Sequence, residues 1–214
     1  PGPQGNPGSG GGPQGFLRLY DWMGVVKKIG QATLGEASTG QFVRDMAYCP
    51  TNNHVYACVR APFSPGYPDG QEPGSVVVFD CSTMAIIANI ALPDGFKVGY
   101  GMAHCPINDL IYVTDLSANL FEIDPSTNIL VSNQPLSVCT LPQKIEFCPK
   151  NDLLYITGES SIEGLNPLSK TVEAIIPLGF RTGPIAYSPI NEKLYILRTQ
   201  DQVLVVDPET NMAG

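Results

Sequence analysis

Histidine is the side chain that most often acts as a general base or metal ligand near neutral pH, and the chain has two, His54 and His104. His104 occupies a position of an internal repeat that is aromatic in the other copies, as Tyr48, Phe147 and Tyr187, which favours a packing role. Because the repeat places no second histidine near His104, neither a zinc site nor a Ser-His-Asp triad is expected. No glycine-rich loop joins a strand to a helix, which argues against a phosphate-binding loop. The sequence therefore predicts no catalytic residue, no metal site and no cofactor.

Four basic residues suggest a different chemistry, the binding of anions. Arg44, Lys97, Lys144 and Arg181 lie in or beside the connections that lead into the first strand of each repeat. In a ring of repeats these connections share one face, so the four side chains are predicted to form a partial basic ring on a protein of net charge −8. Such a ring would bind an acidic peptide or a small anion. Ordinary solvated loop charge is the alternative interpretation.

Acidic and aromatic residues also recur, at positions that favour structural roles. Asp80, Asp124 and Asp207 each precede a turn in a separate repeat and are interpreted as turn-forming residues. Glu146 is the one acid expected on the inner strand, which is too little for a metal cage. Four tyrosines at one shared position are predicted to be buried between neighbouring repeats: Tyr56, Tyr112, Tyr155 and Tyr195.

The six cysteines are predicted to be mainly free thiols. Cys49, Cys105 and Cys148 each precede a proline at one repeat position, so they lie in different repeats and cannot readily pair with one another. Cys58 or Cys139 could instead pair with a cysteine of a neighbouring strand, so one disulfide is an alternative. The chain contains no Asn-x-Ser/Thr sequon, and together these features favour a reducing, intracellular setting.

The elements that position these residues follow from the repeat itself. Four segments align: DMAYCPTNNHVYACV from Asp45, GMAHCPINDLIYVTD from Gly101, KIEFCPKNDLLYITG from Lys144 and PIAYSPINEKLYILR from Pro184. Once the Pro/Gly-rich insert at 61–75 is set aside, the period is about forty residues. Each unit contains four short apolar runs separated by turns, such as Asp124-Pro125-Ser126-Thr127-Asn128, in which the proline and the asparagine suit the turn dihedrals.

Four hairpin-connected strands in about forty residues are typical of a β-propeller blade. The chain from about Phe16 to Asn211 resembles propeller repeats of the YVTN and WD-repeat kind. Tyr112-Val113-Thr114-Asp115 and Tyr155-Ile156-Thr157-Gly158 look like the Tyr-Val-Thr-Asn motif, and Asp-Pro-x-Thr-Asn is the turn usual in that family. The Trp-Asp and Gly-His signatures of true WD repeats are absent.

The predicted fold is therefore all-β, a β-propeller of four-stranded antiparallel blades that is incomplete at both ends. Further polypeptide is expected to complete a ring of seven or eight blades, with a five-bladed ring as the alternative. The predicted units are a Pro/Gly-rich loop or linker at 1–15, a half blade at 16–40, a blade with its insert at 41–99, blades at 100–142 and 143–183, and an incomplete blade at 184–214 that stops in its last turn.

The leading hypothesis for function is a non-catalytic protein–protein interaction scaffold in a larger assembly, with a cytoskeletal or ciliary setting as an analogy. The acidic net charge and scattered basic residues argue against nucleic acid. No apolar run approaches the roughly 18 residues that a membrane span needs. Two alternatives remain open. One is a lactonase-like or quinone-dependent propeller enzyme whose site lies in blades outside this sequence, and the other is an extracellular surface or adhesion propeller, which the YVTN resemblance implies.

Overall fold

The computed structural model describes residues 14–15, 34–35, 42–60, 74–93, 99–132, 136–137, 139–198 and 202–213. The predicted linker at 1–15, the half blade at 16–40 and the insert at 61–75 lie almost wholly outside these ranges. What the structure describes there is a short antiparallel pair of β1 (Gln14–Gly15) and β2 (Leu34–Gly35). In the part of the chain that is described, no helix is long and apolar enough to cross a membrane.

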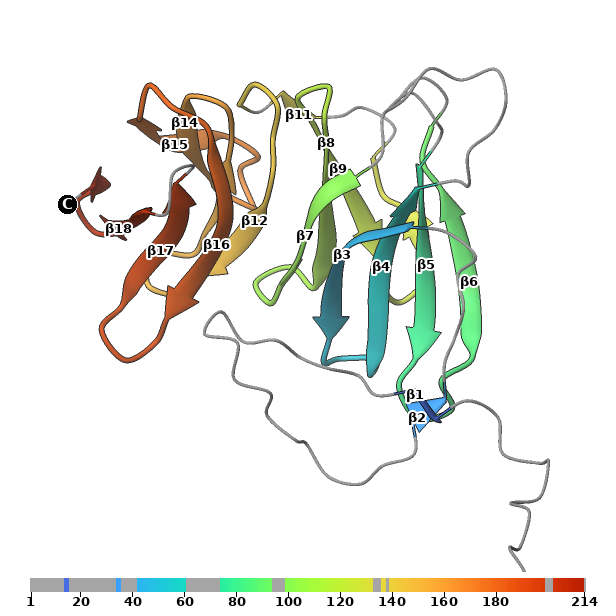
Figure 1. Ribbon diagram of the computed structural model, residues 1–214. Coiled ribbons are helices and arrows are strands. Elements are labelled where there is room, and N and C mark those ends of the chain that lie inside the picture. The colour runs from blue at the N-terminus through green and yellow to red at the C-terminus, as the bar shows by residue number, and fades with distance from the viewer. Residues whose placement is uncertain are drawn as a thin grey trace, which may run out of the picture.

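Four antiparallel sheets follow one another along the chain, and the strands of each pair in sequence order (Figure 1). The first sheet contains β3 (Phe42–Cys49), β4 (His54–Arg60), β5 (Gly74–Asp80) and β6 (Ile86–Ala91). The second contains β7 (Gly99–Cys105), β8 (Leu110–Asp115), β9 (Asn119–Asp124) and β10 (Ile129–Leu130), with β11 (Leu136–Ser137) also paired to β9. The third contains β12 (Ile145–Cys148), β13 (Leu153–Thr157), β14 (Ser161–Leu165) and β15 (Val172–Pro177). The fourth contains β16 (Thr182–Ser188), β17 (Lys193–Arg198), β18 (Gln202–Asp207) and β19 (Met212–Ala213).

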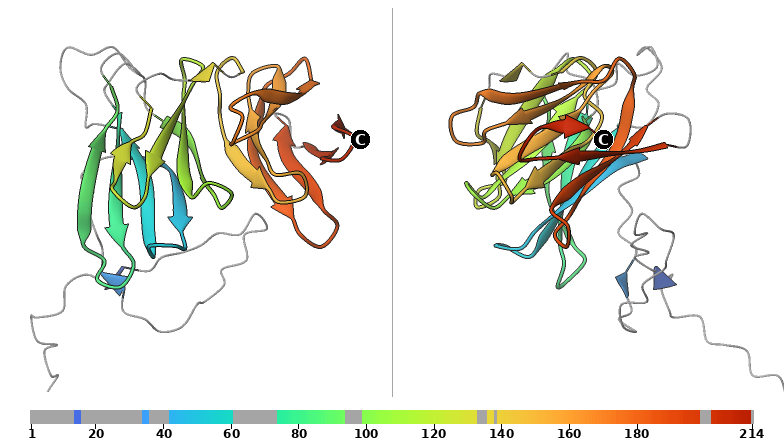
Figure 2. Two further views of the ribbon diagram at one scale, coloured as in Figure 1. Left: turned by 180° about the vertical axis from the view of Figure 1, so that it is seen from behind. Right: turned by 90° about the vertical axis from the view of Figure 1, so that its left-hand side faces the viewer.

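These sheets are arranged as four blades of a β-propeller, which confirms the predicted fold class (Figures 1 and 2). The last blade differs from the prediction in one respect, because the chain does not stop in the turn after the third strand. Asn211 adopts a left-handed φ of 54°, and its N–H donates to the Asp207 carbonyl at 2.8 Å. This tight turn brings Met212 and Ala213 back beside β18 as a short fourth strand.

The turns use the same left-handed position in every blade, and the residues there are not glycines. In the turn between the first and second strands the positions are Asn53, Asp109, Asp152 and Glu192, with φ between 53° and 61°. In the turn between the third and fourth strands they are Met84, Asn128, Lys170 and Asn211, with φ between 54° and 61°. A left-handed residue at the end of a type I turn matches the twist of the paired strands, so the repeated turns set the hairpin register.

The aspartates that precede the last turn act as predicted. The carboxylate of Asp80 accepts from the backbone N–H groups of Ser82 at 2.7 Å and Thr83 at 3.0 Å. Asp124 and Asp207 accept in the same way from the residue two places on, at 2.8 and 3.0 Å. These N–H groups favour the charged carboxylate, so they hold the pKa of Asp80 below its usual value. The turn-forming role is confirmed.

The hydrophobic core lies between neighbouring sheets. Tyr56, Tyr112 and Tyr155 are fully buried there, as predicted, whereas Tyr195 of the fourth sheet is only partly buried. The reason is positional, because no further sheet in the described part of the chain packs against the fourth one. The thiols follow the prediction too. All six cysteines are free, the three at the shared repeat position are fully buried, and Cys81 is the one that is not buried.

Each of the three fully buried tyrosines belongs to a polar contact between sheets that we call the blade latch. In it, an asparagine amide of one sheet donates both to the tyrosine hydroxyl of its own sheet and to a backbone carbonyl in the last turn of the next sheet. The amide-to-carbonyl distances are 2.9, 3.2 and 2.8 Å at the three joints. The latch residues are Asn52 and Tyr56 facing Pro125, Asn108 and Tyr112 facing Pro167, and Asn151 and Tyr155 facing Pro208.

Candidate binding site at the inner strands

The first strands of the four sheets, β3, β7, β12 and β16, pack against one another on the inner side of the propeller. The predicted basic residues fall at the start of these strands. Arg44 lies in β3 and is exposed, Lys144 directly precedes β12, and Arg181 directly precedes β16. Lys97 lies outside the described residues. The structure therefore places three of the four predicted binding residues at one end of the inner strands, which we call the mouth.

At the mouth the lysine is already engaged by the first sheet. Nζ of Lys144 is 2.9 Å from Oδ2 of Asp45 and donates to the backbone carbonyl of Arg44 at 3.2 Å. Asp45 also accepts from the N–H of Met102 in the second sheet at 3.0 Å. One carboxylate thus joins the inner strands of three sheets. It also neutralises part of the predicted basic ring, which leaves Arg44 and Arg181 as the guanidinium groups of the mouth.

Asp45 is a site residue that the sequence reasoning missed. The signal was present in the alignment, because this acid stands where the other copies have Gly101, Lys144 and Pro184. An acid and a lysine at the same repeat position of different blades can meet only if the inner strands converge. Arg181 is fixed in a similar way, since its guanidinium donates to Oε1 of Gln143 at 2.9 Å.

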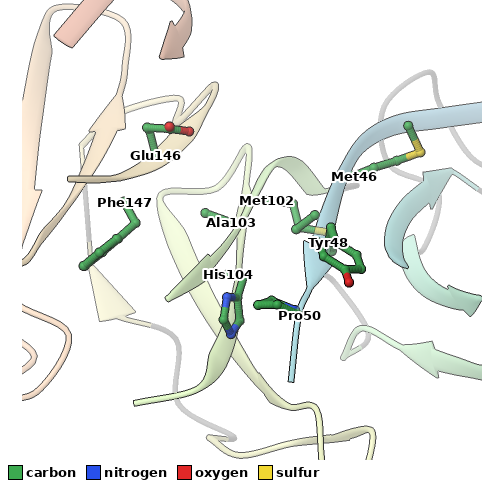
Figure 3. A pocket seen from close by; sticks show the side chains of 9 residues that line it. Met46, Tyr48, Pro50, Met102, Ala103, His104, Glu146 and Phe147 are labelled. Carbon is green, nitrogen blue, oxygen red and sulfur yellow. The ribbon is translucent and has the colours of Figure 1, made fainter. Parts of the chain in front are cut away.

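Beyond the mouth, the inner strands border a shallow, largely open cavity of about 400 Å³. Figure 3 shows that its lining comes from three sheets. The side chains that line it are Met46, Ala47, Tyr48, Pro50, Met102, Ala103, His104, Glu146 and Phe147. Met46 and Tyr48 are each about half exposed, at 51% and 52%. The cavity therefore offers thioether and aromatic surface together with the Glu146 carboxyl and the His104 imidazole, a mixed lining on which apolar and polar groups can both pack.

Glu146 is the ionisable group whose environment is most altered in this cavity. Burial raises the pKa of its carboxyl to about 7, because the charged form loses hydration. The N–H of Tyr187, at 3.3 Å from Oε1, offsets part of that effect, and the negative charge of Asp45 adds to it. Near neutral pH this carboxyl can therefore either donate or accept a hydrogen bond.

His104 is largely enclosed, with 9% of its side chain exposed, and its Nε2 lies 2.8 Å from Oδ1 of Asp109. The equivalent contact in the first sheet is that of the Tyr48 hydroxyl with Oδ1 of Asn53, at 3.1 Å. The imidazole thus takes the place of an aromatic ring, as the sequence predicted. The structure adds that Cys49 of the first sheet lies beside this pair, which the sequence reasoning did not foresee.

Comparison with known proteins supports the architecture. No protein-family model matches the sequence, and no curated protein matches it. Among solved structures, hydrazine synthase of Kuenenia stuttgartiensis superimposes with a TM-score of 0.60 at 14% sequence identity. The match covers 83% of this chain and 51% of that one, so the chain spans about half the length of this neighbour. The shared fold is a β-propeller. At this identity the likeness shows the fold alone, and the YVTN or WD-repeat subfamily stays a prediction.

Proposed function

We propose that this propeller is a non-catalytic interaction scaffold that binds an acidic peptide segment of a partner protein at the mouth. The observation that carries the proposal is the convergence of Arg44, Lys144 and Arg181 on one end of the inner strands, above a cavity with half-exposed apolar side chains. The guanidinium groups suit carboxylates, while Met46 and Tyr48 suit an apolar residue next to them. The packed inner strands hold these groups in place without further ordering.

Binding of a fluorescent peptide that combines glutamates with one central leucine tests this function. We expect micromolar binding that weakens as salt is raised, because the contact is with exposed charge. Arg44→Ala and Arg181→Ala should each weaken binding by about five- to tenfold. Lys193→Gln is the matched control, because Lys193 lies in β17 and pairs with Asp207 at 2.6 Å, away from the mouth. Equal losses in all three variants, or binding insensitive to salt, would exclude the mouth as the site.

The same protein tests whether these blades themselves carry an enzyme site, which is distinct from the alternative of a site in blades outside this sequence. The chemically distinctive group of the cavity is the Glu146 carboxyl, so a lactonase-like or quinone-dependent activity of this part of the chain would depend on it. We expect no turnover of lactone or quinone substrates. Turnover by the parent protein that disappears in the Glu146→Gln variant would contradict the scaffold hypothesis and favour an enzyme.

The state of the cysteines supports placing this scaffold in a reducing, intracellular compartment. All six are free thiols, and five of them are buried. An extracellular surface role is the competing hypothesis. Labelling of the protein directly after lysis distinguishes the two, because an intracellular scaffold is expected to present Cys81 as a reactive thiol. Recovery of Cys81 in a disulfide would favour the extracellular role.

A further inference from the structure

A thiol, an imidazole and a carboxylate meet at the joint between the first and second sheets, at the end of the inner strands opposite the mouth. Cys49 is the last residue of β3, His104 lies in β7, and Asp109 belongs to the turn that follows β7. One ligand atom from each of these three side chains lies within 4.8 Å of the other two. The two nearest, Nε2 of His104 and Oδ1 of Asp109, are 2.8 Å apart.

A hydroxyl connects the thiol to the carboxylate. Oγ1 of Thr51 donates to Oδ1 of Asp109 at 2.9 Å and lies 3.0 Å from Sγ of Cys49. Exposure changes across the cluster, from 0% for Cys49 through 9% for the His104 side chain to 46% for the Asp109 side chain. The cluster is therefore enclosed on its sulfur side and open to solvent on its carboxylate side, so an ion could enter there.

The other two joints show that this combination is not required by the repeat. At the position of the imidazole, the second joint has Phe147 and the third has Tyr187. At the third joint the equivalent acid, Glu192, is neutralised by Lys150 at 2.6 Å. Thr51 takes the place of that lysine at the first joint, so a hydroxyl stands there instead of a positive charge. At the first joint, an imidazole and a hydroxyl thus stand where other joints have an aromatic ring and a cation, and both can donate electron pairs to a metal ion.

We propose that this joint binds Zn²⁺ through the thiolate of Cys49, an imidazole nitrogen of His104 and a carboxylate oxygen of Asp109. Sulfur, nitrogen and oxygen donors are those that zinc prefers, and tetrahedral coordination places its ligand atoms about 3.5 Å apart. To reach that spacing, the 2.8 Å contact between Nε2 of His104 and Oδ1 of Asp109 must lengthen, and the solvent-exposed carboxylate is the group that has room to move. The fourth position is filled by water or by the hydroxyl of Thr51. Because the ligands come from two sheets, the ion fixes the first blade to the second.

Metal titration of the purified, tag-free chain tests the site. After removal of metals with a chelator, zinc is added in competition with a chromophoric chelator, and we expect one ion per chain with micromolar or tighter affinity. Cobalt(II) in place of zinc is expected to show a thiolate-to-metal charge-transfer band, which reports the sulfur ligand directly. Cys49→Ser, His104→Phe and Asp109→Asn should each weaken zinc binding at least tenfold and abolish or reduce this band.

The second joint provides matched controls, because Cys105 and Asp152 occupy the same repeat positions beside Phe147. Cys105→Ser and Asp152→Asn are expected to leave zinc affinity unchanged. His104→Phe copies the aromatic ring of that joint, so its metal-free melting temperature should stay close to that of the parent, while zinc should raise the melting temperature of the parent alone. The proposal fails if no zinc binds at one equivalent, if binding persists in both Cys49→Ser and His104→Phe, or if Cys105→Ser loses the cobalt band equally.

Discussion

The side chains of the inner strands show how one buried group can couple ionisation to stability. Glu146 extends from β12 towards the backbone of the fourth sheet, where it accepts the Tyr187 N–H. The position is held by alanine in the other three copies, as Ala47, Ala103 and Ala186, so this carboxyl replaces a methyl group on the inner strand. Its pKa of about 7 means that the folded protein holds a proton there that the unfolded chain releases near pH 4.5.

Glu146→Gln is expected to stabilise the protein at pH 8 and to have little effect near pH 4. Between about pH 4.5 and 7 the native state binds the extra proton, so native stability falls as the pH rises through this window. At pH 8 the buried charge costs about 1–3 kcal/mol, which the neutral amide avoids. Urea unfolding across pH 4–8 measures the difference. Glu159→Gln, at an exposed position, is the control, and a pH-independent effect of Glu146→Gln would contradict the expected linkage.

Tyrosines at the shared repeat position should contribute differently to stability according to whether a neighbouring sheet covers them and completes a blade latch. The hydroxyl of Tyr155 meets Asn151 in its own sheet and Asn211 in the next, the latter at 2.6 Å. Tyr155→Phe leaves these partly buried partners short of a hydrogen bond, so we expect a loss of about 1–3 kcal/mol. Tyr195→Phe is the matched change, because its hydroxyl contacts the exposed Asn191, and should cost less than about 0.5 kcal/mol. Chemical denaturation compares the two, and equal costs would mean that the fourth sheet is covered.

At the scale of the elements, the inner strands approach so closely that one position excludes even a methyl group. A Cβ added at Gly101 in β7 would lie 2.7 Å from the Cα of Lys144 and 2.9 Å from the carbonyl oxygen of Gln143. Both are backbone atoms, which cannot rotate away. Gly101 therefore allows the second and third blades to come together at the mouth, where the ion pair of Lys144 and Asp45 is made.

Gly101→Ala should push these two strands apart and destabilise the protein by about 1–3 kcal/mol. Gly183→Ala is the control, because a methyl group there would meet its nearest neighbour, the Leu197 carbonyl oxygen, at an ordinary 3.6 Å. We expect the control to cost less than about 1 kcal/mol. Thermal unfolding of both variants and of the parent protein measures the difference between these two losses of stability. A Gly101→Ala protein as stable as the parent would show that the inner strands can separate without loss.

At the scale of the whole molecule, the four blades differ in how they are covered. The second and third sheets each pack between two others, whereas the first and fourth each have one neighbouring sheet among the described residues. The exposed apolar side chain of Val203, at 42%, marks the uncovered face of the fourth sheet, whereas Ala57, Val59 and Val77 on the corresponding face of the first sheet are buried. The face of the fourth sheet resembles those that are buried at the three joints, so further polypeptide is a suitable partner for it.

Hydrogen exchange is expected to follow this difference. In the monomeric 214-residue chain, amides of β8 and β13 should exchange slowest, because their sheets are covered on both sides, and amides of β18 and β19 should exchange markedly faster. Mass spectrometry of quenched, digested samples resolves these segments. Protection of Val203 to Asp207 equal to that of β13 would show that another part of the chain covers the fourth sheet.

Local patterns determined most of the architecture. The forty-residue period, the aspartate turns, the buried tyrosines and the free thiols at the shared position all follow from residues close together in sequence, whose hydrogen bonding and periodicity are set locally.

The pairing of charged groups at the mouth depends instead on which blades converge there. Asp45 meets Lys144 about a hundred residues away, so a predicted basic group proved to be half of an ion pair. The meeting of Cys49 with His104, the raised pKa of Glu146 and the partial exposure of Tyr195 likewise depend on which sheet packs on which. No local pattern specifies that packing, because it is decided by the burial of whole sheet faces.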